Sequence, residues 1–233
     1  MKKVKKFIID SLLKIIFSIL LVWLIAALSC VLGPALFRIH WLTTESLVFS
    51  ACFLAYFIIH FALYKPILSH VMAHELTHAL AAILMGGKVT SIHASTTGGT
   101  TVINKSHLFI SLAPYIFPLY TAVALGLFAI AADSFQLPFL GLIGFTYAFH
   151  LALTIYSLSH HQPDLKEGGV VFSLIFILAG NMIVLMLLIS FLWPHALPFS
   201  QAFSETFHWA IRLAQSLYNF LIPHLNHSEG KSS

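Results

Sequence analysis

Three residues in the first half of the chain have the types and the spacing of a catalytic metal site. His74, Glu75 and His78 stand in the order His-Glu-x-x-His within the stretch VMAHELTHALAAILMGG. Residues four positions apart on a helix share one face, so His74 and His78 can hold one metal ion between them. Glu75 lies beside the first histidine, where a carboxylate can accept a proton from an attacking water molecule. The pattern is typical of zinc peptidases.

A plainer interpretation is a helix in which two histidines and a carboxylate are simply packed. An unpaired carboxylate is costly in such apolar surroundings, which favours a functional role for Glu75. His70 continues the row of histidines on the same face, one turn before His74. Three ligands from one straight helix cannot surround a metal ion, because they lie in a row about 6 Å apart. We therefore expect His70 to pack beside the site.

The third ligand of a catalytic zinc ion must come from a distant part of the chain, because such an ion needs three protein ligands and an open position. Asp164 is the best candidate. It lies between two apolar segments in a Pro-Asp-x-x-x-Gly-Gly setting, which would break a helix and aim a side chain. Glu167 and His161 belong to the same polar cluster and are the alternatives. A solvated loop between helices is the non-functional interpretation of this cluster.

The composition indicates a helical membrane protein. Hydrophobic residues make up 59% of the chain and charged residues only 9%, whereas soluble domains carry about 25% charged residues. The apolar segments are long rather than alternating, as expected of membrane-spanning helices. The net charge of +4 comes largely from the N-terminus, so it concerns orientation in the membrane and not nucleic acid binding. Cys30 and Cys52 both lie in apolar segments, which excludes a disulfide framework.

We expect an all-α membrane protein with about six transmembrane helices and a C-terminal amphipathic helix. The four lysines within the first six residues place the N-terminus in the cytoplasm. Gly33-Pro34 is expected to end the first helix, and Pro114 and Pro118 to kink the fourth. The expected helices are residues 12–33, 46–64, 67–85, 108–132, 137–158 and 170–193. Residues 200–222 have apolar side chains at helical spacing, and they lie on the membrane or pack as a seventh helix.

A short β-hairpin is expected directly after the His-Glu-x-x-His helix. Residues 88–106 are polar, and two short strands surround Thr97-Gly98-Gly99-Thr100, where Gly-Gly is a turn signal. Such a hairpin is either an exposed loop or a strand pair near the active site, whose edge pairs with an extended substrate peptide. His93 lies within it and is expected at the surface rather than at the metal.

These motifs resemble the site-2 protease family of intramembrane zinc metallopeptidases, and most closely its compact bacterial branch. The resemblance covers roughly residues 66–190 and rests on HELTH, the GGKVTSI stretch and the GGTT turn, in that order. It implies that His74, His78 and Asp164 bind Zn²⁺ and that Glu75 is catalytic. The chain has Leu112-Ala113-Pro114 where the family often has Ala-Gly-Pro. It has Leu165 where the family often has Gly after the ligand Asp.

The resemblance implies a zinc metalloprotease that hydrolyses peptide bonds in transmembrane segments of membrane proteins, located in the bacterial inner membrane. Its partners would be a membrane-protein substrate and the lipid bilayer. The expected organisation is N-terminal transmembrane helices in residues 1–65, a metallopeptidase-like core in residues 66–193, and an amphipathic helix with a tail in residues 194–233.

Two other functions remain open at this stage. A membrane di-iron oxygenase, such as a lipid desaturase, would need about eight histidines in several boxes. Only His74-x-x-x-His78 and the His160-His161 pair suggest such boxes. A membrane transporter or a catalytically inactive metal-binding membrane protein is the other alternative, because polar residues within membranes mark functional sites in general.

Counting the expected helices creates a conflict within the proposed ligand set. A cytoplasmic N-terminus puts His74 near the cytoplasmic side and the loop at residues 159–169 on the opposite side. Ligands of one metal ion must lie together. If Asp164 is a ligand, one segment must therefore be re-entrant, or helix ends must unwind near the middle of the membrane.

Overall fold

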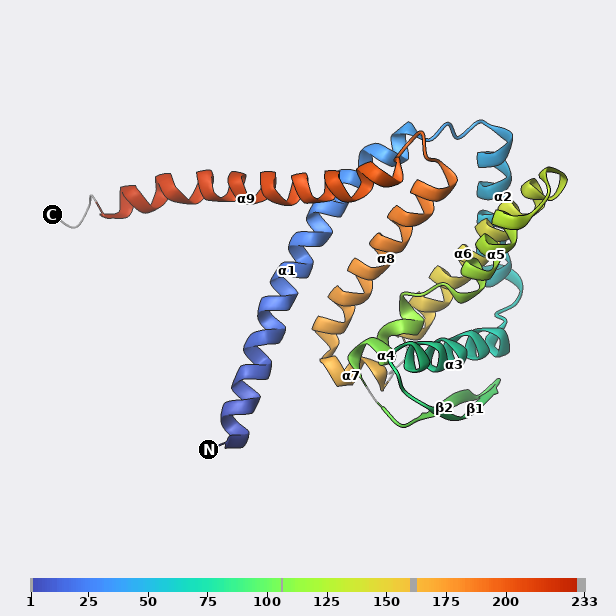
Figure 1. The fold of residues 1–233 in the computed structure, drawn as a ribbon, viewed down its shortest axis with the longest axis horizontal. Coiled ribbons are helices and arrows are strands. Elements are labelled where there is room, and N and C mark those ends of the chain that lie inside the picture. Colours follow the sequence, from blue (N-terminus) through green and yellow to red (C-terminus); the bar gives the residue numbers. More distant parts are fainter. Residues whose placement is uncertain (1, 106, 160–162, 230–233) are drawn as a thin grey trace. The chain divides into compact units, whose positions relative to one another are not determined.

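A computed structural model describes residues 2–105, 107–159 and 163–229 (Figure 1). His161 and the His160-His161 pair lie outside the described residues. The described chain is helical apart from one two-stranded hairpin. It divides into two compact units, residues 40–177 and residues 1–39 with 178–233. Helix α8 (Val170–Leu192) begins in one unit and ends in the other.

The unit that holds both termini contains α1 (Lys2–Arg38) and α9 (Phe199–Glu229). The expected end of the first helix at Gly33-Pro34 is wrong, because α1 continues through Pro34 to Arg38. Gly33 has no Cβ to collide with the proline ring, which removes much of the usual constraint before proline. The last turn also buries Ala35 completely.

Helix α9 crosses α1, and the indole Nε1 of Trp23 donates to the carbonyl of Ala210 at 3.1 Å. Apolar side chains on α9 stay exposed within this unit, among them Phe203, Phe207 and Ile211. An exposed apolar row on a largely polar helix agrees with the amphipathic helix predicted for this segment.

The unit of residues 40–177 contains the hairpin and the candidate site. Its elements are α2 (Thr44–Ile58), the π-helix η1 (Ile59–Leu63), α3 (Ile67–Leu84), β1 (Val89–Ser95), β2 (Gly98–Ile103), α4 (Leu108–Leu112), the 3-10 helix η2 (Ala113–Tyr115), α5 (Leu119–Ile130), α6 (Asp133–Ser159), α7 (Asp164–Gly168) and the start of α8. Helix α6 packs along α2 and α5, and its core with α2 includes Tyr56, Phe149 and Leu153. At Gly144 a Cβ would lie 2.3 Å from the Phe49 carbonyl oxygen, so a glycine is needed where α6 meets α2.

Several described helices are long and apolar enough to cross a membrane, which supports the prediction of an all-α membrane protein. By length and composition these are Ile9–Arg38, Thr44–Leu63, Ile67–Leu84, Asp133–Ser159 and Val170–Leu192. Leu108–Tyr115 and Leu119–Ile130 add a sixth if they count as one span. The two pieces are bent by 69°, which confirms the kink predicted at Pro114 and Pro118.

Helix α3 has a different direction from its neighbours in the same unit. Figure 1 shows it running across the direction of α2, α5 and α6, with the hairpin beside it. Helix α3 ends at Leu84, and Gly86 follows its C-cap with a φ of 70°, a left-handed conformation that glycine adopts without strain. The predicted glycine stop of this helix is thereby confirmed.

The hairpin is present, but its turn is not where the sequence pattern placed it. Ser95 pairs with Gly98, so the turn residues are Thr96 and Thr97, and the two glycines open β2. The Ser95 hydroxyl accepts a hydrogen bond from the Thr97 backbone N–H and donates to the Gly98 carbonyl. A serine side chain therefore closes the turn, which leaves Gly99 free for a close contact with α3.

Candidate metal centre

Two histidines of α3 and one aspartate of α7 converge on a single point. The Nε2 atoms of His74 and His78 lie 3.1 Å apart. The Oδ2 atom of Asp164 lies 3.3 Å from Nε2 of His74 and 3.6 Å from Nε2 of His78. Among the described residues, these three form the one group of potential metal ligands whose donor atoms all lie within 4.8 Å of one another.

The donor set fits a tetrahedral metal ion. Zinc binds imidazole nitrogen and carboxylate oxygen at about 2.0–2.2 Å, which puts neighbouring ligand atoms of a tetrahedron about 3.3–3.6 Å apart. The three observed separations are close to this range. Three protein donors also leave one tetrahedral position open, as in catalytic zinc sites.

The packing of α7 aims Asp164 at the two histidines. Leu165 is buried in a cluster with Leu112, Tyr115 and Ile177, which fixes the short helix against its surroundings. The buried Ser173 hydroxyl donates to the Leu165 carbonyl at 3.1 Å. Leu165 is therefore an anchor for the helix that carries the aspartate.

Hydrogen bonds from outside the ligand group orient two of its members. Nδ1 of His78 lies 2.8 Å from the carbonyl oxygen of Ile110. A carbonyl only accepts, so Nδ1 carries a hydrogen, and Nε2 is the ring nitrogen that can give up its proton to bind a metal. The Tyr115 hydroxyl donates to Oδ2 of Asp164 at 3.0 Å, and its ring lies edge-on to His74 with centroids 5.3 Å apart.

The Asp164 carboxylate is held in its charged form. Burial by itself raises its pKa, but hydrogen bonds with His74 and His78 and the charges of these imidazoles outweigh burial. Together they keep the pKa of this carboxyl well below its usual range. At neutral pH the group is therefore an anionic oxygen donor, as a metal ligand must be.

Glu75 is buried with an exposed fraction of 7%, and a residue of the hairpin is its partner. The Thr101 hydroxyl lies 2.6 Å from Oε2 of Glu75 and 3.0 Å from the carbonyl oxygen of the same residue. The carboxylate is thus hydrogen-bonded inside the protein rather than left unpaired, and it is not a member of the ligand group.

The other candidates from the sequence lie elsewhere. Glu167 accepts a hydrogen bond from the Ser111 hydroxyl and is outside the ligand group. His161 lies outside the described residues. His70 is hydrogen-bonded through Nε2 to the Ser157 hydroxyl at 2.7 Å, in line with its predicted place beside the site. His93 is exposed on β1, as predicted.

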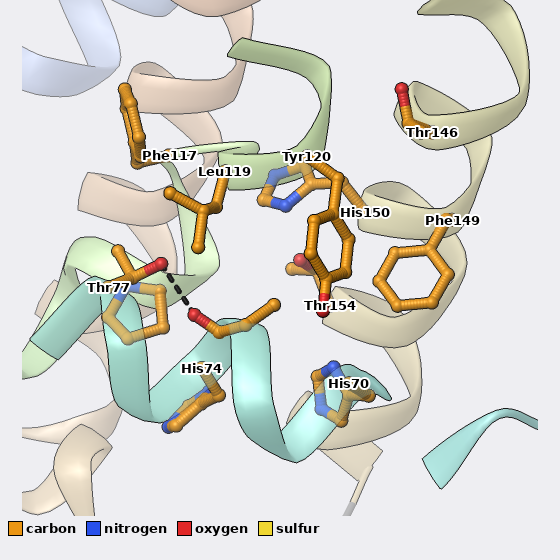
Figure 2. Close-up of a pocket in the computed structure, with 12 residues that line it drawn as sticks. His70, His74, Thr77, Phe117, Leu119, Tyr120, Thr146, Phe149, His150 and Thr154 are labelled. Carbon is orange, nitrogen blue, oxygen red and sulfur yellow. Dashed lines mark hydrogen bonds between the residues drawn. The ribbon is translucent and has the colours of Figure 1, made fainter. Parts of the chain in front are cut away.

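A small cavity borders the site between α3, α5 and α6 (Figure 2). Its volume of about 20 Å³ has room for about one water molecule and not for a substrate side chain. Polar groups of His70, Tyr120, His150 and Thr154 lie along its wall.

Two residues that orient the site were not found by sequence reasoning. Thr101 is 26 positions from Glu75, and Tyr115 is 49 positions from Asp164. Neither pair has a spacing that a helix or a hairpin alone would bring together. The available signal was indirect, because Tyr115 directly follows the Leu112-Ala113-Pro114 triplet and Thr101 is the last residue of the GGTT stretch.

Comparison with protein family models, with curated proteins and with solved structures gives no match to this chain. The described fold and site therefore carry the functional conclusion. They define a helical membrane protein in which a His-Glu-x-x-His helix and an aspartate from a distant segment form a group that could hold a metal ion.

A metal ion held by this group should bind about 10–100-fold more weakly when Tyr115 is replaced with phenylalanine, because such outer hydrogen bonds fix the orientation of ligands. Competition with a chromogenic chelator measures the affinity. Tyr120→Phe is the matched control, since its hydroxyl donates to the Ser69 carbonyl on α3 rather than to a candidate ligand. Equal zinc affinity in both variants would show that the Tyr115 contact does not support the site.

Proposed function

We propose that this protein is an intramembrane zinc metalloprotease that hydrolyses peptide bonds in transmembrane segments of membrane proteins. One observation carries the proposal. The Asp164 carboxylate lies 3.3 Å from His74, although 90 positions separate them in the chain. A motif typical of zinc peptidases thus has a third donor from a separate segment, and the number and kind of donors suit catalytic zinc.

Zinc is the metal that we assign to this site. Two imidazole nitrogens and one carboxylate oxygen are a donor set found in zinc hydrolases. Zinc bound there would lower the pKa of a water molecule and polarise the scissile carbonyl. His74, His78 and Asp164 hold the ion, and the Ile110 carbonyl and the Tyr115 hydroxyl keep two of these ligands in orientation.

Glu75 is the general base and acid in this proposal. Its carboxylate accepts a proton from the attacking water and later delivers that proton to the leaving amine. Its position next to His74 in the chain keeps it near the reacting atoms. Its burial, with an exposed fraction of 7%, removes competing bulk water from the carboxylate.

We propose that the chain is related to the site-2 proteases, that it lies in a bacterial inner membrane and that its N-terminus is cytoplasmic. We also propose that α3 lies along the membrane rather than across it, which its direction relative to α2, α5 and α6 supports (Figure 1). Helix α5 then leaves the side on which α3 lies, and α6 returns to it. Asp164 and His74 are then on the same cytoplasmic side of the membrane. This removes the conflict between the number of membrane crossings and the shared metal site.

The substrate that we propose is a single membrane-spanning helix that unwinds locally at the site. A peptide bond inside a helix is covered by its own hydrogen bonds, so a protease must receive it in an extended form. The short hairpin beside α3 supplies strand edges to which such a segment could pair.

The test uses the full chain, purified and reconstituted in liposomes with a panel of labelled single-span polypeptides. We expect cleavage within the spanning segment, loss of cleavage after treatment with a chelator, and recovery on addition of zinc. Cleavage that resists the chelator would contradict the zinc mechanism. Solute uptake by zinc-loaded protein without cleavage of any polypeptide would favour the transporter alternative.

A further inference from the structure

We propose that Thr101 positions the catalytic carboxylate of Glu75, so that the hairpin is part of the catalytic apparatus and not only a neighbour of it. The inference rests on the proposed function, because it assigns a positioning residue to that reaction. Its structural basis is a contact between β2 and α3 that neither the motif nor the ligand group includes.

The hydrogen-bond geometry is the first argument. Oγ1 of Thr101 lies 2.6 Å from Oε2 of Glu75, a length typical of hydroxyl donation to a carboxylate. The same oxygen lies 3.0 Å from the Glu75 backbone carbonyl. Thr101 therefore contacts both the end of this side chain and its backbone. A buried carboxylate needs a donor, and among the described residues Thr101 is the hydrogen-bond donor to this one.

The close approach of β2 is the second argument. A Cβ on Gly99 would lie 2.6 Å from Cγ and 2.7 Å from Oε1 of Glu75, and 2.7 Å from Cγ1 of Val71. Gly99 and Thr101 are two positions apart on a strand, so both face α3. The strand backbone at Gly99 thus restricts the conformations of the Glu75 side chain from one side. The Thr101 hydroxyl fixes the position of Oε2 by a hydrogen bond.

The consequence for catalysis follows from these two contacts. A general base must lie within hydrogen-bond reach of the proton that it accepts, and a misplacement of about 1 Å can cost about 100-fold in rate. Thr101 acts through Glu75, so it is a positioning residue. Loss of its hydroxyl should lower the rate of the chemical step without weakening substrate binding.

The first measurement compares Thr101→Val, which keeps the shape but loses the hydroxyl, with Thr101→Ser, which keeps the hydroxyl. We expect kcat to fall by about 10–100-fold in Thr101→Val with unchanged KM and zinc content, and to recover largely in Thr101→Ser. Thr100→Val is the matched control, because Thr100 is exposed on the same strand and donates only to the Gly99 carbonyl. Equal kcat in Thr101→Val and wild type, or an equal loss in both valine variants, would overturn the proposal.

The second measurement does not depend on activity. Hydrogen exchange of the β2 amides in the full chain should become faster in Thr101→Val and in Glu75→Ala, stay unchanged in Thr101→Ser, and show no further rise in the double variant Thr101→Val/Glu75→Ala. Unchanged hydrogen exchange of the β2 amides in Thr101→Val would show that the hydrogen bond between Thr101 and Glu75 does not hold β2 on α3. Faster exchange in Thr101→Val together with a wild type that cleaves nothing would overturn the proposed function, and with it the catalytic assignment, while the contact would stand.

Discussion

Replacing Glu75 with glutamine is expected to lower the rate of peptide cleavage by about 10²–10⁴-fold and to leave zinc bound. Glutamine has the shape of glutamate, and its amide oxygen can still accept a hydrogen bond from Thr101. It cannot accept a proton from water, so the general-base step is lost. Zinc should remain because Glu75 is not a member of the ligand group, which His74, His78 and Asp164 form.

Cleavage measured under single-turnover conditions, together with metal analysis of the same preparations, tests this expectation. Glu45→Gln is the matched control, because Glu45 is exposed in the first turn of α2 and should leave cleavage and zinc unchanged. A Glu75→Gln variant that cleaves at the wild-type rate would contradict the assigned mechanism. A variant that loses its zinc would show that Glu75 contributes to the metal site.

Replacing Asp164 with alanine is the second substitution with a large expected effect. Removal of a ligand should cost more than the roughly 10–100-fold in metal affinity that loss of an outer hydrogen bond costs. Two histidines from one helix would remain, without the anionic donor that lies 3.3 Å and 3.6 Å from them. We therefore expect more than a 100-fold loss of zinc affinity in chelator competition, and no measurable cleavage.

Glu167→Ala is the control for this prediction, since Glu167 lies on the same short helix and was an alternative ligand. Its carboxylate accepts from the Ser111 hydroxyl and stands outside the ligand group, so zinc affinity should stay at the wild-type value. If Glu167→Ala lost zinc and Asp164→Ala kept it, Glu167 and not Asp164 would be the third ligand.

The choice between these two carboxylates shows where sequence reasoning ends. Both lie within one turn of α7, and both have a chemistry that suits a metal. Which one faces α3 depends on the packing of Leu165 against Tyr115 and Ile177, which come from other helices. A local pattern could therefore narrow the third ligand to a few residues, but the tertiary packing was needed to bring Asp164 to His74.

Local sequence signals predicted a helix or a turn correctly where no contact with another part of the chain changes the local conformation. The helical spacing of His74 and His78 and the stop at Gly86 needed no knowledge of the fold. The turn of the hairpin was misplaced because Gly99 is used for the close contact with Glu75 rather than for chain reversal. The end of α1 was misplaced because Gly33 has no Cβ to collide with the ring of Pro34, so the helix continues to Arg38.

The direction of α3 was beyond sequence reasoning for a related reason. Its length and hydropathy meet the criteria for a membrane span, so the sequence counts it as one. Its packing on the hairpin and on the α4–η2 segment turns it across α2, α5 and α6 (Figure 1). In the arrangement that we propose, with α3 along the membrane, this one helix accounts for the conflict between the number of expected spans and the ligand set.

Elemental analysis of the purified protein is the most direct test of the proposal that His74, His78 and Asp164, which could hold a metal ion, form a catalytic zinc site. We expect close to one zinc ion per chain, removable by a strong chelator and restored by added zinc. A protein that contains no zinc after purification and binds none when it is added would contradict the account. Iron in place of zinc would contradict it as well, and would favour an oxygen-dependent reaction at the same residues.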